Sequence, residues 1–137
     1  MGCGTWTSQD WDSYTTSRGY SDSSSARDLY KSSYMKDDFN PNGVKFRESC
    51  DSEEHPNSSP VIIGLDVTGS MSSVLETVSL KLNTLITEIF DRNPIKDPQI
   101  MFMAFGDSYY DSCPLQVTQF ESDIRIAEQL NDIYFER

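Results

Sequence analysis

The chain has 137 residues, enough for one domain, and only 36% of them are hydrophobic. Its formal net charge of -11 argues against non-specific binding to nucleic acid or to an anionic membrane, because both require basic surface. No apolar run approaches the roughly 18 residues of a membrane span, and the first residues lack the apolar core of a signal peptide. We therefore expect a cytoplasmic protein, of bacterial or phage-like type, with neither nucleic acid nor membrane as a partner.

The cysteines predict a reduced chain without a zinc site. Cys3, Cys50 and Cys113 are odd in number and far apart, and His55 is the one histidine. Because no Cys-x-x-Cys or paired Cys and His spacing is present, the sequence contains no zinc pattern. Isolated thiols of this kind are typical of a reducing compartment.

Residues 1–59 are expected to form a mostly irregular, acidic tail and linker rich in serine and tyrosine. They contain 13 serines and scattered aromatic residues, but Leu29 and Val44 are their only leucine, isoleucine or valine residues. Such a segment buries too little apolar surface to offset its chain entropy, so we expect residues 1–40 to be disordered or draped over another surface. The aromatic residues either contact a partner or belong to a solvated tail.

Three local features interrupt this segment. Residues 26–36 are compatible with a short helix, and the Asn-Pro-Asn-Gly sequence at residues 40–43 is a strong turn signal. Residues 44–47 then suit a short edge strand, and the acidic stretch 51–60 is expected to be a linker.

From Pro60 onward the pattern changes to that of an α/β domain, residues 60–137. Residues 61–65 and residues 100–105 are continuous apolar runs, and apolar side chains on both faces indicate central strands of a parallel sheet. A helical stripe of about 20 residues lies between them, so that strand, helix and strand form a right-handed crossover. The stripe consists of positions spaced by four, four, three and four residues, Val74, Val78, Leu82, Leu85 and Ile89, and it is widened by Leu75, Ile86 and Phe90.

The remaining elements complete the predicted order β-α-β-β-α. Ser72 or Ser73 is the expected N-cap of the long helix, and Glu76 is placed to close a capping box with Ser73. Residues 115–118 follow a loop too short for a parallel crossover, so they should form an antiparallel edge strand. A last helix is expected from Asp123, with an inner face made of Ile126, Leu130, Ile133 and Tyr134.

The loop between the first strand and the long helix carries the candidate chemistry. The strand ends at Asp66, and Thr68 and Ser70 follow at alternate positions, with Gly69 allowing a tight turn. These side chains offer oxygen atoms at the carboxyl end of a strand, where open α/β sheets bind ligands. Hard oxygen ligands suit Mg²⁺ or Mn²⁺, which makes the loop a candidate metal site.

The Asp-x-Thr-x-Ser pattern formed by Asp66, Thr68 and Ser70 resembles the metal-ion-dependent adhesion site (MIDAS) of von Willebrand factor A (VWA) domains. Its signature there is Asp-x-Ser/Thr-x-Ser. The order of elements is similar too, from hydrophobic strand through metal loop and long helix to a second hydrophobic strand, a short antiparallel strand and a helix. The resemblance implies a Rossmann-like, mostly parallel sheet with flanking helices. It covers residues 60–137 and none of residues 1–59.

This resemblance implies a divalent-metal-dependent protein-binding module and not an enzyme. In that family two hydroxyls, here those of Thr68 and Ser70, bind the metal directly, and the carboxylate, here Asp66, acts through water and hydrogen bonds. The implied cofactor is Mg²⁺, or otherwise Mn²⁺ or Ca²⁺. Because neutral ligands leave most of the charge of the ion unneutralised, an acidic residue of a protein partner completes its coordination.

The same comparison implies that the chain holds only the N-terminal half of such a domain. A whole domain has more strands, and its further metal-site residues, a Thr and an Asp, lie in later loops that have no match after Phe120. The first strand, residues 61–65, would keep one unpaired apolar edge, which is a template for association. A truncated reading frame and a second chain that completes the sheet both fit this organisation. A half-domain should be marginally stable alone.

Three alternatives remain open for the loop. In the first, Thr68 and Ser70 merely cap a helix beside a turn-forming Asp66. In the second, Asp66 is the nucleophile of a Mg²⁺-dependent phosphoryl-transfer enzyme, because the loop also resembles that of haloacid-dehalogenase-like phosphatases. Lys81 and Lys96 are poorly placed for that family, and its acidic pair is missing. In the third, a structural or assembly protein keeps the fold with a degenerate metal site.

Overall fold

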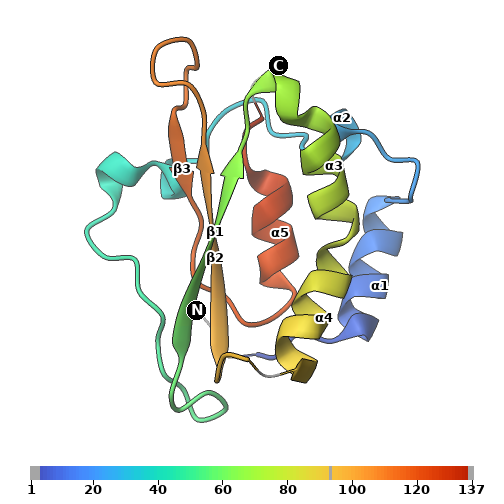
Figure 1. The fold of residues 1–137 in the computed structure, drawn as a ribbon, viewed down its shortest axis with the longest axis vertical. Helices are drawn as coiled ribbons and strands as arrows, with labels where there is room; N and C mark the ends of the chain where they lie inside the picture. The colour runs from blue at the N-terminus through green and yellow to red at the C-terminus, as the bar shows by residue number, and fades with distance from the viewer. Residues whose placement is uncertain (1–3, 93, 136–137) are drawn as a thin grey trace.

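The computed structural model describes residues 4–92 and 94–135 and contains a three-stranded sheet with helices packed on one face (Figure 1). The strands are β1 (Ser59–Asp66), β2 (Pro98–Phe105) and β3 (Leu115–Val117), in the order β1-β2-β3. β1 and β2 are parallel, and β3 is antiparallel to β2. The predicted α/β class and the antiparallel edge strand are confirmed.

β1 is an edge strand and not the central strand that its apolar run predicted. Val61, Ile63 and Leu65 pack with the helices, whereas Ile62 on the other face is exposed. Within the described residues β2 is the neighbour of β1 on one side, and nothing pairs with it on the other. The two apolar runs look alike in sequence, but β2 is flanked by strands on both sides and β1 is not.

The predicted long helix is divided into α3 (Ser72–Leu80) and α4 (Leu82–Arg92) by an irregular residue, Lys81. Hydrogen bonds from Lys81 N to the Thr77 carbonyl and from Leu85 N to the Lys81 carbonyl, at 2.9 and 3.1 Å, bridge the break. The helical hydrogen-bond pattern therefore continues across it.

The buried side of α3 and α4 lies along one border of the predicted stripe. Leu75, Leu82 and Ile86 are buried in the core, whereas Val74 and Leu85, expected on the inner face, are exposed. A face centred on Leu75, Leu82 and Ile86 and a face centred on Val74 and Leu85 both satisfy the helical period. The neighbouring helices select the observed one, because they cover the side of α3 and α4 on which Leu75, Leu82 and Ile86 lie.

The start of α3 also differs from the prediction. Its N-cap position is Met71, which has no side-chain cap among the described residues, so neither Ser72 nor Ser73 caps the helix. Glu76 closes no capping box there. Its Oε1 accepts a hydrogen bond from the Ala26 amide at 2.9 Å. The carboxylate assigned to local capping thus ties α3 to the N-terminal segment.

The last helix is confirmed as α5 (Arg125–Asp132), which begins two residues after Asp123. Tyr134 lies beyond its end and is only partly buried. The other residues of the predicted inner face are buried: Ile126, Leu130 and Ile133.

Residues 4–59 are folded, which corrects the prediction of a disordered tail. They contain α1 (Ser8–Arg18), α2 (Ala26–Leu29) and two 3-10 turns, η1 (Asp37–Phe39) and η2 (Pro41–Gly43). Large side chains of this segment enter the same core as the later elements, among them Trp6, Tyr14, Leu29, Tyr30 and Phe39. A few large aromatic side chains bury enough apolar area to order the segment, although it is poor in aliphatic residues.

Buried hydrogen bonds fix this segment to the later helices. The Tyr14 hydroxyl donates to Asn131 Oδ1 of α5 at 2.8 Å, and the Tyr30 hydroxyl donates to the Leu75 carbonyl of α3 at 3.0 Å. α1 is the outermost helix in Figure 1, so the helices next to the sheet are themselves covered. The N-terminal segment is therefore an outer layer of the molecule.

The expected short helix over residues 26–36 is limited to the single turn of α2, and residues 44–47 form no strand. Gln99 of β2 is buried and exchanges two hydrogen bonds with the Cys50 main chain, at 2.9 and 2.7 Å. Val44 packs against the small cluster formed by Met101 of β2, Val117 and Phe120. Residues 44–50 are thus attached to the sheet on the face that carries no helix.

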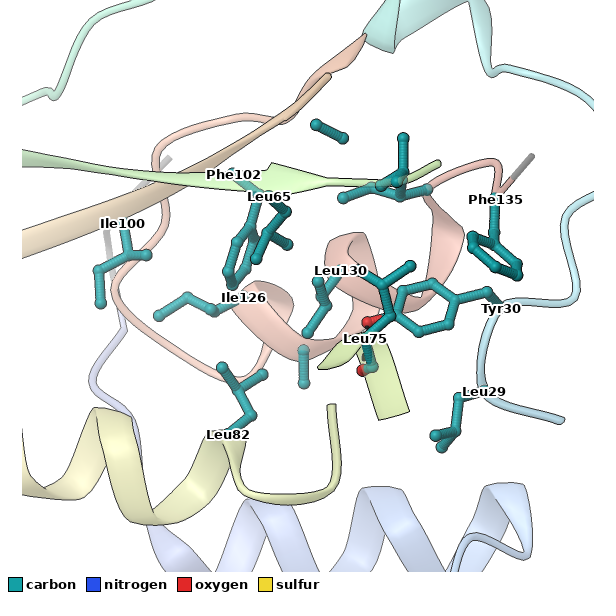
Figure 2. Close-up of a cluster of buried hydrophobic side chains, with 14 of the residues drawn as sticks. Leu29, Tyr30, Leu65, Leu75, Leu82, Ile100, Phe102, Ile126, Leu130 and Phe135 are labelled. Atoms are coloured by element: carbon teal, nitrogen blue, oxygen red, sulfur yellow. Dashed lines mark hydrogen bonds between the residues drawn. The ribbon is translucent and has the colours of Figure 1, made fainter. Parts of the chain in front are cut away.

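The main core lies between the sheet and the helices. Figure 2 shows Leu65 and Phe102 pointing from the strands toward Ile126 and Leu130 of α5, with Leu75 beside them. In the described part of the chain no helix is long and apolar enough to cross a membrane.

The cysteines are consistent with the predicted reduced chain where they are described. Cys50 and Cys113 are not in a disulfide. Cys3 lies outside the described residues.

Candidate metal centre

β1 ends at Asp66, and residues 67–71 connect it to α3. The ladder continues for one residue, because Val67 N donates to the Phe105 carbonyl at 2.9 Å and the Val67 side chain is fully buried. The 3-10 turn η3 (Gly69–Met71) then leads into α3. Asp66 and this loop therefore lie at the carboxyl ends of the parallel strands, the edge at which α/β sheets bind ligands.

The structure brings the three predicted oxygen-bearing side chains together. Thr68 donates twice to Asp66 Oδ1, from its amide at 2.9 Å and from its hydroxyl at 2.7 Å. The hydroxyl oxygens of Thr68 and Ser70 lie 3.4 Å apart. Adjacent ligands of an octahedral ion lie about 3.0 Å apart at Mg²⁺ distances and about 3.4 Å apart at Ca²⁺ distances. The two hydroxyls, which are also within hydrogen-bond distance of each other, therefore have the separation of neighbouring Ca²⁺ ligands, and Mg²⁺ would require them to approach by about 0.4 Å.

Asp66 is the anion of this cluster. The hydrogen bonds from the Thr68 hydroxyl and amide lower the pKa of the Asp66 carboxyl below its ordinary value. Both bonds end on Oδ1, and no group in residues 4–92 and 94–135 donates to Oδ2. A hydroxyl that donates its proton to Asp66 keeps its lone pairs, so Thr68 Oγ1 remains able to bind a cation.

The loop does not have the hydrogen bonds of the helix-capping alternative. Thr68 occupies the N-cap position of η3 and Met71 that of α3, and neither side chain caps its helix within the described residues. The Thr68 hydroxyl turns toward Asp66 and lies next to the Ser70 hydroxyl. Asp66 does form the local turn that this alternative included, but the two hydroxyls stay available to a ligand.

Two further acidic residues follow β2 near this edge of the sheet. Asp111 Oδ2 accepts a hydrogen bond from the Asp107 amide at 2.6 Å, and Asp107 Oδ1 accepts one from the Tyr109 amide at 2.7 Å. These bonds stabilise the loop that contains the residues themselves. They do not link the loop to Asp66.

The lysines that a phosphatase-like site would use lie away from Asp66. Lys96 precedes β2 at the opposite end of the parallel pair, and the eight residues of β1 correspond to roughly 23 Å. Lys81 is exposed and follows α3, whose nine residues extend over roughly 13 Å. Neither position matches the arrangement that phosphoryl transfer at Asp66 requires.

A hollow beside the loop was missed by sequence reasoning. A cavity of about 460 Å³ is lined by the loop, by α3 and by the N-terminal segment, through residues that include Ser25, Arg27, Gly69, Ser72 and Glu76. Residues 25–28 belong to the segment expected to be mostly irregular, with a short helix possible from residue 26, and nothing in that expectation placed them beside the loop. Their Ser-x-x-Asp capping box is the local signal that fixes the start of α2, whereas its position beside the loop has no local signal.

No protein-family model, curated protein or solved structure matches the chain. Within residues 4–92 and 94–135, no three His, Cys, Asp or Glu side chains form a group that could hold a metal ion. The candidate centre is thus a cluster of one carboxylate and two hydroxyls. Its motif and its geometry are the support for the function proposed below.

Proposed function

We propose that the loop of Asp66, Thr68 and Ser70 binds a divalent cation, Mg²⁺ or otherwise Mn²⁺ or Ca²⁺, and that the protein uses it to bind an acidic side chain of a protein partner. The observation that carries the proposal is the pair of hydroxyl oxygens 3.4 Å apart, with Asp66 accepting the Thr68 proton. Neutral hydroxyls and one carboxylate suit hard cations.

The residues of the loop have separate roles in this function. Thr68 and Ser70 supply neutral oxygen ligands, and Asp66 orients Thr68 and adds one negative charge nearby. A bound cation supplies positive charge that this set of ligands leaves largely unneutralised. A carboxylate from a partner then gains a charge-assisted contact at an exposed loop. This is a binding function and involves no bond cleavage.

We extend the proposal to the fold that carries the loop. The element order β1, α3–α4, β2, β3, α5 is similar to the order expected for the N-terminal half of a VWA domain with a Rossmann-like sheet, and this similarity supports the proposal. The similarity of the Asp-x-Thr-x-Ser loop to a MIDAS supports the same assignment. In this proposal residues 60–137 form the half-domain, and residues 4–59 cover its helices.

The phosphoryl-transfer alternative has less support. A nucleophilic Asp66 would need a basic residue close by, and Lys81 and Lys96 both lie away from it. Trapping of an acyl phosphate at Asp66 would establish that alternative. A structural protein with a degenerate site remains the second alternative, and it differs from our proposal in predicting no metal binding.

Calorimetric titration of the chain with Mg²⁺ and Mn²⁺ tests the proposal. We expect binding that weakens at least tenfold in Thr68→Val and in Ser70→Ala, since each variant removes one ligand. Thr77→Val is the matched control, because the Thr77 hydroxyl donates to the Ser73 carbonyl within α3. Equal affinity of Thr68→Val and the wild-type chain would show that this loop is not the metal site.

A further inference from the structure

We propose that the loop between β2 and β3, residues 106–113, binds arginine side chains of a basic protein partner. The proposal goes beyond metal binding and does not depend on it. It rests on two exposed tyrosine rings, on two carboxylates that lack a cationic partner, and on the hydrogen bonds that hold both in place.

This loop lies at the same edge of the sheet as the candidate metal centre. Phe105, the last residue of β2, is the register partner of Asp66, and its carbonyl accepts a hydrogen bond from the Val67 amide at 2.9 Å. The loop begins at the next residue, Gly106, and projects beyond the sheet in Figure 1. A partner bound to the loop therefore lies on the side of the molecule that carries Asp66.

Two neighbouring tyrosines of the loop extend into solvent. Tyr109 and Tyr110 are 86% and 83% exposed. Their ring centroids are 5.3 Å apart and the rings meet edge to face at 67°, so ring faces remain accessible on the outside of the pair. The rings bury little apolar area within the chain, and tyrosine is among the commonest anchors of protein interfaces. The pair is thus better suited to contact a partner than to stabilise the fold.

Hydrogen bonds within the loop fix the position of the tyrosines. Asp107 Oδ1 accepts from the amides of Tyr109 and Tyr110, at 2.7 and 3.3 Å. Asp111 Oδ2 accepts from the Asp107 amide at 2.6 Å. A Cβ atom at Gly106 would collide with the Asp111 carboxylate, so this close approach requires glycine. Because the loop is held in this shape without a partner, binding costs little additional chain entropy.

The charge of the loop selects a cationic ligand. The sequence between Lys96 and Arg125 contains no lysine or arginine, and within the described residues no basic side chain forms an ion pair with Asp107 or Asp111. One oxygen of each carboxylate accepts the hydrogen bonds of the loop, which leaves the other for a ligand. The net charge of -11 attracts a basic partner from a distance as well.

Guanidinium groups match both the rings and the carboxylates. A planar guanidinium stacks on an aromatic face and donates paired hydrogen bonds to a carboxylate, whereas the compact, strongly hydrated ammonium of lysine does so less well. The same carboxylates repel nucleic acid and other anions. The partner that fits is therefore a protein segment with exposed arginines. A carboxylate elsewhere on that partner can still reach a cation at Asp66.

Fluorescence anisotropy of a labelled peptide of alternating arginine and glycine, titrated with the full chain in EDTA, tests the proposal separately from metal binding. Salt of 0.15 M screens charges beyond about 8 Å, so local contacts dominate. We expect binding that weakens roughly threefold or more in Tyr109→Ala, in Tyr110→Ala and in Asp107→Asn, which keeps an oxygen for the loop amides. Tyr34→Ala and Asp12→Asn are the matched controls, since each removes an exposed ring or charge elsewhere, and neither should change the affinity.

NMR shift mapping on the wild-type chain identifies the surface without any variant. The amide signals of residues 106–113 should shift first as the peptide is added, and a matching lysine peptide should bind roughly threefold more weakly. No binding up to about 1 mM peptide, or shifts centred on another part of the chain, would overturn the proposal. Equal affinity of the tyrosine variants and the wild-type chain, or equal binding of the two peptides, would overturn it too.

Discussion

Replacing Leu29 by alanine tests whether the N-terminal segment belongs to the folded core. Leu29 is fully buried in α2, the one-turn helix that packs against α3. The substitution removes about three buried carbon atoms, worth about 2.4 kcal/mol of transfer free energy, and leaves a cavity that adds to the loss. We expect the free energy of unfolding to fall by about 3 kcal/mol.

Urea unfolding followed by circular dichroism measures this change. With a slope of about 2 kcal/mol per M, the expected loss lowers the midpoint by about 1.5 M. Should the alanine variant have no folded baseline, Leu29→Val, with an expected loss of about 1 kcal/mol, keeps the comparison possible. Phe46→Ala is the control, since Phe46 is 81% exposed and its loss should stay within about 0.5 kcal/mol.

The result that refutes this reasoning is a Leu29→Ala midpoint equal to that of the wild-type chain. Such a result would mean that residues 4–59 do not stabilise the remainder of the protein. The tail predicted from composition would then describe the segment better than the packed layer does.

The remaining predictions concern single interactions. Tyr14→Phe should lower the free energy of unfolding by about 1–3 kcal/mol in the same assay, because it leaves a buried acceptor on α5 unpaired. Gln99→Leu should cost a similar amount by removing the two hydrogen bonds to Cys50. Thr68→Val should raise the pKa of Asp66 toward its ordinary value in a carboxyl-carbon NMR titration. Because the pKa of Asp66 is lower in the folded than in the unfolded chain, the ionised carboxylate stabilises the fold above its unfolded pKa. This contribution is lost as the pH falls through the folded pKa. Thr68→Val should therefore reduce the acid-induced loss of stability below about pH 4.

Much of the sheet could be predicted from the sequence because its signals are local. Two apolar runs marked β1 and β2, and the short connection after β2 required β3 to be antiparallel. The apolar run of β1 wrongly indicated a central strand, whereas the expectation of an unpaired edge, drawn from the half-domain comparison, agrees with the strand order. Apolar side chains on both faces of a strand indicate that both faces of the sheet are covered. They do not show whether the strand is hydrogen-bonded to a neighbour at both edges or at one edge only.

The N-terminal segment was mispredicted because its buried residues are not regularly spaced along the sequence. α1 is rich in serine, threonine and aspartate and carries no regular apolar stripe, and it is held by Tyr14 and by Trp6 just before it. Single aromatic side chains of this kind are recognised as core only when their surroundings are known. The side chains of Asp66, Thr68 and Ser70 lie close together as expected, because the residues are near in sequence and share one loop. The wall formed by residues 25–27 is distant in sequence and was not expected there.

The central claim is that the loop of Asp66, Thr68 and Ser70 binds a divalent cation, and paramagnetic NMR tests it most directly. Substoichiometric Mn²⁺ added to the isotope-labelled chain broadens the signals of nuclei close to the ion. We predict that the amide signals of residues 66–71 broaden first, that excess Mg²⁺ restores them, and that Ser70→Ala abolishes the effect. Broadening centred on other acidic residues, with the signals of residues 66–71 unchanged, would contradict the account.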